Sequence, residues 1–341
     1  MIPGKLVTSL LKEVSRSFYL TLRVLPGPIR NQIGLAYLLA RTTDTIADTG
    51  LVPIGQRLEA LRALRDRIMG SRKAPLDFGG LARHQGSAAE RVLLEQCTTS
   101  VAVLDTLAPE DIQRVRDVLG IIIGGQELDL RRFAGASAES VVALRTEADL
   151  DDYTYRVAGC VGEFWTRMCL AHLFSKTKLD EAGLLARGVR FGKGLQLVNI
   201  LRDLPVDLRK GRCYLPEEDL ERCGLKPPQL LQTANEERMR PLYDRYLERA
   251  EENLRSGWEY TQMLPRKAVR VRLACAWPLL IGRDTVQRLR AGRVLDPQQR
   301  IKITRAEVRK IMMQTVLYYP WPGAWDRLFY RDTSSFTLSN I

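Results

Sequence analysis

Two stretches of this chain place carboxylates at helical spacing inside apolar helical patterns. Residues 33–48 read IGLAYLLARTTDTIAD, in which apolar residues at helical spacing lead to Asp44 and Asp48 at positions i and i+4. Residues four apart on a helix lie on one face, about 5–6 Å from each other. Two like charges placed there repel unless a cation neutralises them. The pattern predicts a helix with a cation-binding acidic face, or a helix end that has reached solvent.

The second stretch, residues 195–207, reads LQLVNILRDLPVD. Gln196, Asn199, Asp203 and Asp207 fall at i, i+3, i+7 and i+11, which a helix keeps close to one stripe. Polar groups inside so apolar a run need partners, although a solvated charged face would use the same residues. Pro205 is expected to kink or end the helix, because proline lacks the backbone N–H that a helix needs. Asp207 is therefore expected on a bent or broken last turn.

Both stretches carry arginine beside the acids, at Arg41 and Arg202. Mg²⁺ prefers carboxylate, amide and water oxygens, and it commonly binds through one or two carboxylates together with substrate phosphates. Acidic helices with arginine close by suit a diphosphate held through Mg²⁺. A surface network of salt bridges would use the same residue types.

The composition is that of an ordinary globular protein with a large core. The 341 residues are 45% hydrophobic and 27% charged, and helical periodicities dominate over strand alternation. We expect one all-α domain with an insertion or loop at 69–87, where the sequence reads MGSRKAPLDFGGLARHQGS. We expect no membrane span, because no apolar run reaches 18 residues, and no secretory signal, because MIPGKLVTSLLKEVSRSFY lacks a long apolar segment. The six cysteines form no CxxC pair, which favours reduced thiols in a cytoplasmic protein and argues against zinc.

The formal net charge of +12 indicates an anionic partner. Nucleic acid, an anionic membrane surface and anionic substrates are the candidate classes. Because zinc-finger spacing and glycine–aromatic RNA motifs are absent and the basic residues are spread along the chain, we expect no nucleic-acid partner. Diphosphate substrates and a peripheral contact with the inner face of a membrane account for the charge.

Five segments, in order along the chain, resemble the squalene and phytoene synthase family of head-to-head prenyl transferases. They are SRSFYLTLRVLP, YLLARTTDTIAD, DDYTYRVAGCVGEFW, GLQLVNILRDLPVD and GRCYLP. The resemblance covers about residues 10–315, most like a bacterial squalene synthase. It implies an all-α, single-domain isoprenoid synthase fold whose helices surround a central cavity, with the two acidic motifs facing each other. The catalytic domain is expected at 1–316 and an aromatic-rich tail at 317–341.

The resemblance also assigns roles to individual residues. The implied Mg²⁺ ligands are Asp44, Asp48, Asn199, Asp203 and Asp207. The implied catalytic residues are Tyr37, Arg41, Tyr153 and Arg202. The implied substrate contacts are Ser15, Arg16, Ser17, Phe18, Ala158, Val161, Gln196 and Arg212. Taken alone, Ser15 or Ser17 would also suit a helix N-cap, and Tyr37 a core aromatic. The chain departs from the family pattern at Arg156, where a tyrosine is usual, and at Ala47 and Val206, where acids are common.

The implied reaction joins two farnesyl diphosphates into presqualene diphosphate, which NADPH then reduces to squalene. Lys302 and Arg305, in QQRIKITRAEVRKIMM, resemble the basic segment that meets the NADPH phosphates, although a solvated basic helix face is the alternative. Ala274 stands where eukaryotic squalene synthases have an aromatic residue. Dehydrosqualene, phytoene, hydroxysqualene or presqualene diphosphate itself therefore remain alternative products.

The C-terminal stretch gathers aromatic residues around helix breakers. Its aromatics are Tyr318, Tyr319, Trp321, Trp325, Phe329 and Tyr330, and Pro320, Pro322 and Gly323 interrupt any long helix. Tryptophan and tyrosine favour the membrane interface, so this stretch is expected to touch a membrane or, alternatively, to pack back onto the helical body.

Overall fold

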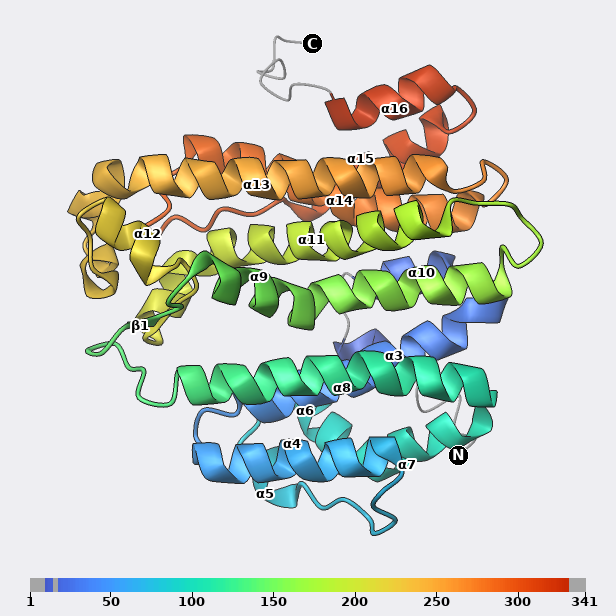
Figure 1. Cartoon of the computed structure of the whole chain (residues 1–341), viewed down its shortest axis with the longest axis horizontal. Helices are drawn as coiled ribbons and strands as arrows, with labels where there is room; N and C mark the ends of the chain where they lie inside the picture. Colours follow the sequence, from blue (N-terminus) through green and yellow to red (C-terminus); the bar gives the residue numbers. More distant parts are fainter. Residues whose placement is uncertain (1–9, 15–17, 331–341) are drawn as a thin grey trace. The chain divides into compact units, whose positions relative to one another are not determined.

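The computed structural model describes residues 10–14 and 18–330, and these residues confirm the all-α class. Helices dominate, and β1 (Val142–Ala143) and β2 (Arg212–Cys213) form a short parallel pair (Figure 1). Within the described part of the chain, every helix is too short or too polar to cross a membrane.

The chain divides into two compact units, and each unit combines two separate segments of the sequence. The first unit comprises Met1–Ala134 and Arg156–Leu185, and the second comprises Gly135–Tyr155 and Ala186–Ile341. The first contains α2 (Phe18–Val24), α3 (Gly27–Asp48), α4 (Ile54–Met69), α5 (Gly79–Ala82), α6 (Ala88–Glu95), α7 (Cys97–Ala102), η1 (Val103–Thr106), α8 (Pro109–Arg132) and α10 (Cys160–His172). The second contains β1, α9 (Glu147–Thr154), most of α11 (Glu181–Arg209), β2, α12 (Glu217–Arg222), η3 (Pro227–Leu231), η4 (Thr233–Asn235), α13 (Glu236–Met263), α14 (Val269–Ala291), α15 (Arg305–Tyr318) and α16 (Pro322–Tyr330). Between α9 and α10 the chain forms the π-helix η2 (Tyr155–Gly159).

Helix α3 is the central element of the first unit and packs against α8, α4 and α10. Its threonines can be buried because each hydroxyl donates a hydrogen bond to a carbonyl of the same helix. Thr42 donates to Leu38 O at 2.9 Å, and Thr45 donates to Arg41 O at 2.9 Å. These bonds let the segment around Asp44 lie in the interior without unsatisfied hydroxyls.

A buried carboxylate ties three helices of this unit together. Asp111, in the first turn of α8, is 2% exposed and accepts hydrogen bonds from Arg114, from Gln32 of α3 and from His172 of α10. Burial raises the pKa of the Asp111 carboxyl, but these hydrogen bonds outweigh it, so the pKa is lowered. These hydrogen bonds hold α3, α8 and α10 against one another.

Helix α11 continues through Pro205 to Arg209, so the expectation of a break there is wrong. A proline at 205 cannot donate to the carbonyl of Leu201. The buried hydroxyl of Tyr243, on α13, donates to Leu201 O at 2.9 Å instead. The tyrosine supplies the donor that the proline lacks, and Asp207 stays on the same helix as Asp203.

Gly211 ends this segment and allows the β-pair to form. Its φ of +78° lies in the left-handed region, and a Cβ there would approach the backbone of Ser137 to 2.3 Å. The Gly211 carbonyl accepts from Val142 N at 2.8 Å, and Arg212 pairs with Val142 in the β register. The turn thus places the GRCYLP loop beside the strand that precedes α9.

The stretch at 69–87 is more ordered than the sequence suggests. It contains α5, and Phe78 and Leu81 are buried. The backbone N–H of Leu76 also donates to Thr98 Oγ1 at 2.9 Å. The expected insertion or loop therefore contains one short helix, Gly79–Ala82.

The C-terminal helices break where the prolines indicate. Helix α15 crosses the expected boundary at 316/317 and ends at Tyr318, and α16 begins at Pro322. Trp325 and Phe329 are buried and stack on Trp258 of α13, with ring centroids 4.7 and 5.3 Å away. Packing onto the helical body therefore holds for these two aromatics, whereas Trp321 and Tyr330 are exposed.

Candidate active site

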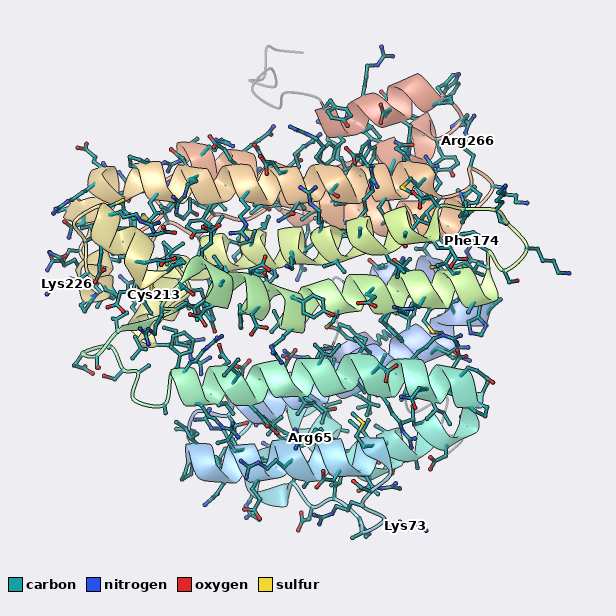
Figure 2. The ribbon with its side chains drawn as sticks, in the orientation of Figure 1. Arg65, Lys73, Phe174, Cys213, Lys226 and Arg266 are labelled. Carbon is teal, nitrogen blue, oxygen red and sulfur yellow. The ribbon has the colours of Figure 1, made fainter. Side chains whose placement is uncertain are left out.

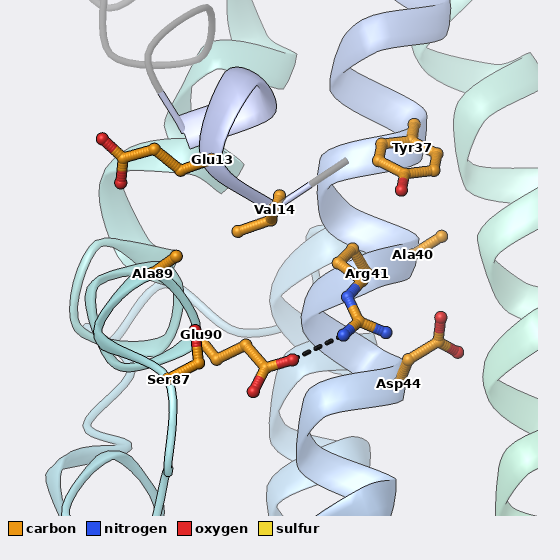
Figure 3. A pocket seen from close by; sticks show the side chains of 9 residues that line it. All are labelled: Glu13, Val14, Tyr37, Ala40, Arg41, Asp44, Ser87, Ala89 and Glu90. Carbon is orange, nitrogen blue, oxygen red and sulfur yellow. Dashed lines mark hydrogen bonds and ion pairs between the residues drawn. The ribbon is translucent and has the colours of Figure 1, made fainter. Parts of the chain in front are cut away.

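The first acidic motif borders a cavity in the first unit. The cavity has a volume of about 530 Å³ and is lined by Glu13, Val14, Tyr37, Ala40, Arg41, Asp44, Ser87, Ala89 and Glu90 (Figure 3). Tyr37, Arg41 and Asp44 follow one another at helical spacing on α3, and Glu90 comes from α6. Arg41 Nη2 lies 2.5 Å from Glu90 Oε1, and the buried Arg41 Nε makes no hydrogen bond.

Asp44 is held by a residue from a distant part of the sequence. The amide nitrogen of Gln126, on α8, donates to Asp44 Oδ1. Burial, followed by repulsion from Asp48, raises the pKa of Asp44 to about 7, although Arg41 and the Gln126 bond oppose the shift. Burial also raises the pKa of Tyr37, so its hydroxyl stays protonated at neutral pH. The positive charge of Arg41 thus does not offset the effect of burial on the pKa of Asp44.

The second acidic motif lies on α11. Gln196, Asn199 and Asp207 are half-buried on this helix. Asp203 accepts two hydrogen bonds from its neighbour Arg202, at 2.9 Å from Nε and 2.5 Å from Nη2. The hydrogen bond with Asp203 raises the pKa of Arg202. Because the two side chains are 35% and 44% exposed, water screens the pair and it stabilises the fold little.

Tyr153 packs against the loop that follows the second motif. Its ring stacks on that of Tyr214, with centroids 4.6 Å apart. Asp151, on the same helix, lies 2.7 Å from Lys193 Nζ and 3.1 Å from Arg249 Nη2, which ties α9 to α11 and α13. The second unit therefore brings the tyrosine segment, the GRCYLP loop and α11 together.

The remaining predicted residues are less closely grouped. Ser15, Arg16 and Ser17 lie outside the described residues, and Phe18 is described only by its place in α2. Ala158 is half-buried in the π-helix, and Val161, at the start of α10, is 40% exposed. Arg212 is half-buried in β2, whereas Lys302 and Arg305 are exposed at the start of α15.

Sequence reasoning missed Glu90, Gln126, Lys193 and Tyr214. Each of these side chains contacts a predicted residue, or its helix, from another part of the chain. Only Tyr214 had a local signal, since it lies in the GRCYLP segment. Glu90 and Gln126 have no motif of their own and depend on the packing of α6 and α8 around α3.

The carboxylate and amide oxygens around Asp44 fit a metal ion that completes its coordination with oxygens of a bound substrate. Among the described residues, no three His, Cys, Asp or Glu side chains gather closely enough to hold a metal by themselves. Asp44 and Asp48 offer two carboxylates one turn apart, and the buried Oε1 of Gln126 beside Asp44 lacks a hydrogen-bond donor. Mg²⁺ commonly takes one or two carboxylates and completes its shell with phosphate and water oxygens. The residues present fit that mode of binding.

The first unit thus places a carboxylate, an arginine and a tyrosine of one helix around a single cavity. The sequence pattern of squalene/phytoene synthases matches residues 11–307, and the chain belongs to that family. The fold is that of the squalene synthases.

Solved structures that share this fold include a dehydrosqualene synthase and a squalene synthase. A dehydrosqualene synthase aligns with a TM-score of 0.67 at 22% identity, covering 93% of this chain and 96% of that one. A squalene synthase from Alicyclobacillus acidocaldarius aligns with a TM-score of 0.60 at 18% identity, covering 85% and 93%.

Curated relatives include enzymes with different products. A bifunctional lycopene cyclase/phytoene synthase of Phaeosphaeria nodorum is 30% identical over 83% of this chain. A 15-cis-phytoene synthase of Synechocystis is 33% identical over 70% of it. The chain spans 46% and 63% of these two proteins. A presqualene diphosphate synthase of Rhodopseudomonas palustris is 28% identical, over 87% of this chain and 92% of that protein.

Proposed function

We propose that this protein joins two farnesyl diphosphates head to head into presqualene diphosphate and then reduces that intermediate to squalene with NADPH. Head-to-head prenyl condensation is the reaction of the family. The observation that carries the proposal is the face of α3, where Tyr37, Arg41 and Asp44 border one cavity. That face offers an anionic substrate a cation, a neutral hydroxyl and a carboxylate for a shared metal.

Mg²⁺ is part of the proposal, with Asp44, Asp48, Asn199, Asp203 and Asp207 as the residues that would hold it. When bound with substrate, it supplies positive charge that stabilises the departing diphosphate oxygens. The raised pKa of Asp44 supports this assignment, because a nearby cation would favour the ionised carboxylate.

The protein's own side chains bind and orient the diphosphate. Arg41 presents a planar fork of N–H donors to the cavity, which suits phosphate oxygens. The Tyr37 hydroxyl, whose pKa is raised, remains a neutral hydrogen-bond donor. Tyr153 is fixed by its stack on Tyr214, which would hold its hydroxyl in one direction for proton handling. Ala158 and Val161 would border the path of a prenyl chain.

The reductive half of the reaction depends on Lys302 and Arg305. Both side chains are exposed at the N-terminal end of α15, where a phosphate would also meet the positive end of the helix dipole. NADPH would supply a hydride to the rearranged cation. A non-reductive outcome is favoured instead by the match to a presqualene diphosphate synthase over nearly its whole length and by the phytoene synthase relatives.

The experiment that tests both halves uses purified protein with farnesyl diphosphate and Mg²⁺, with and without NADPH. We expect diphosphate release in both reactions and squalene only with NADPH. Presqualene diphosphate, hydroxysqualene or dehydrosqualene as the sole product with NADPH would refute the reductive half. A parallel reaction with geranylgeranyl diphosphate tests phytoene formation. The absence of diphosphate release with either substrate would refute the whole proposal.

A cytoplasmic location with peripheral membrane contact belongs to the same proposal. The hydrocarbon product is insoluble in water and must enter a bilayer. The absence of a spanning helix in the described residues is consistent with contact from one side.

A further inference from the structure

Helix α15 exposes an apolar surface on its outer side. Met313, Val316 and Leu317 are 67%, 55% and 61% exposed, and Trp321, in the turn that follows, is 59% exposed. Residues three and four apart share one side of a helix, and the opposite side of α15 buries Ile311 and Thr315 against the rest of the unit. We call these four exposed side chains the α15 apolar face. Clustered exposed apolar side chains of this kind mark an interaction surface.

Positive charge continues the same side of the helix. Arg305, Arg309 and Lys310 precede Met313 by eight, four and three residues, and all three are exposed. The single acid of this helix, Glu307, is occupied by Arg288 and by the N-cap Thr304. The outer side of α15 is therefore basic in its first half and apolar in its second.

A second basic segment borders the apolar end. Arg266, labelled in Figure 2, lies in the turn between α13 and α14 and donates to the carbonyl of Pro320 at 3.0 Å, so its guanidinium group reaches the turn between α15 and α16. Lys267 and Arg270 follow it and are exposed. The nearest acid of α16, Asp326, is turned inward and accepts from Trp258 and Gln262.

We propose that the α15 apolar face docks the protein onto an anionic lipid surface. An interfacial helix buries its apolar side chains at the boundary of headgroups and acyl chains, while neighbouring Lys and Arg meet anionic headgroups. Tryptophan favours that same depth. The proposed contact keeps Leu317 and Trp321 of the aromatic-rich tail and extends it along the outer side of α15, whereas Trp325 and Phe329 are buried in the unit.

A second copy of the chain and a nucleic acid both fit this surface less well than a lipid surface does. A symmetric dimer through this face would bury Met313, Val316 and Leu317, but the outer side of α15 offers no acid other than the paired Glu307 to meet the cations of the other copy. A nucleic acid would use the cations but would leave Met313, Val316 and Leu317 in water. A lipid surface can take up the apolar side chains at the acyl boundary and bind the neighbouring cations through its headgroups.

Sedimentation with vesicles tests the proposal on the full chain. The vesicles contain phosphatidylcholine alone or phosphatidylcholine with phosphatidylglycerol, at low and high salt. We expect salt-sensitive binding to the anionic vesicles only. Binding needs neither substrate nor Mg²⁺, so this proposal, which deepens the proposed membrane contact, and the proposed reaction can fail separately.

Two variants separate the apolar and basic contributions. Met313→Gln, Val316→Gln and Leu317→Gln together should weaken binding at least about tenfold, because three apolar side chains no longer leave water. Arg309→Gln with Lys310→Gln should weaken binding about 30-fold, since each cation near an anionic surface contributes about fivefold.

Control variants remove exposed apolar or charged side chains at other places on the surface. Leu51→Gln replaces a side chain that is 78% exposed in the first unit, and Lys73→Gln with Lys226→Gln removes two exposed charges (Figure 2). Both controls should bind like the unchanged protein. If the charge control weakens binding as much as the Arg309 and Lys310 pair does, binding reflects net charge and the proposal is overturned.

A direct measurement of contact does not depend on the multiple variants. Brominated lipids should quench part of the tryptophan fluorescence, and Trp321→Phe should remove most of that quenching. Equal quenching in both proteins would overturn the proposal. So would unchanged vesicle binding of the triple glutamine variant, or a dimer that this variant dissociates without any vesicle binding by the unchanged protein.

Discussion

The helix that carries the second acidic motif crosses a proline, and one hydroxyl compensates for the missing donor. Tyr243→Phe removes only this hydroxyl and leaves the ring packed, since Tyr243 is fully buried. The Leu201 carbonyl then loses its 2.9 Å bond and has no N–H at position 205 to replace it. A buried acceptor without a donor costs about 1–3 kcal/mol. We expect the free energy of unfolding to fall by that amount in urea titrations followed by circular dichroism.

A second substitution identifies the cause of this loss. Pro205→Ala restores the backbone N–H that can bond to Leu201. Tyr243→Phe should therefore cost less than about 0.5 kcal/mol in the Pro205→Ala background, giving a coupling free energy of about 1–2 kcal/mol between the two sites.

Tyr246→Phe is the matched control. Tyr246 is also buried on α13, but its hydroxyl donates to Asp219 and not to α11. Its cost should add to that of Pro205→Ala within about 0.5 kcal/mol. Should Tyr243→Phe cost the same in both backgrounds, the hydroxyl does not replace the missing N–H and the explanation for the unbroken helix is wrong.

Three further predictions concern the candidate active site. Asp44→Asn and Asp203→Asn should each abolish diphosphate release while the circular dichroism spectrum stays nearly unchanged, and near-normal turnover at saturating Mg²⁺ would contradict the ligand assignment. Because the pKa of Asp44 is raised to about 7, the folded protein retains a proton that the unfolded chain releases, so in chelator-treated protein the free energy of unfolding should fall between about pH 4 and pH 7. Asp44→Asn should remove that part of the pH dependence, and an unchanged slope would contradict the raised pKa. Replacing Lys302 and Arg305 by Ala should raise the NADPH concentration needed and let presqualene diphosphate accumulate while the first diphosphate release persists; equal loss of both steps would show a structural role.

Local patterns in the sequence predicted what depends on local geometry. The apolar periodicity before Asp44 predicted the long helix α3, and the two prolines near 320 predicted the break between α15 and α16. The path of α11 through Pro205 was not predictable in this way, because the compensating donor lies on another helix.

Partners from distant helices also determine the environment of the acids. The contact of Gln126 with Asp44 follows from how α8 packs on α3, and no spacing in the sequence indicates it. Similarly, Trp325 and Trp321 are four residues apart and chemically identical, but only Trp325 meets Trp258. Whether a tryptophan is buried depends on how the surrounding helices pack, which the local sequence does not show.

Each acidic motif pairs its arginine with a carboxylate, and this arrangement bears on how a diphosphate enters. Arg41 is paired with Glu90 in one unit, and Arg202 with Asp203 in the other, both at 2.5 Å. All four side chains are partly exposed, and pairs of this kind contribute only about 0.2–1 kcal/mol. A phosphate group that takes over either guanidinium group therefore breaks a bond worth little and gains charge-assisted bonds to its own oxygens. When Arg202 turns to the phosphate, Asp203 regains both of its oxygens for a cation. In the proposed reaction, the exchange that binds a phosphate at Arg202 would thus also free Asp203, the proposed metal ligand beside it.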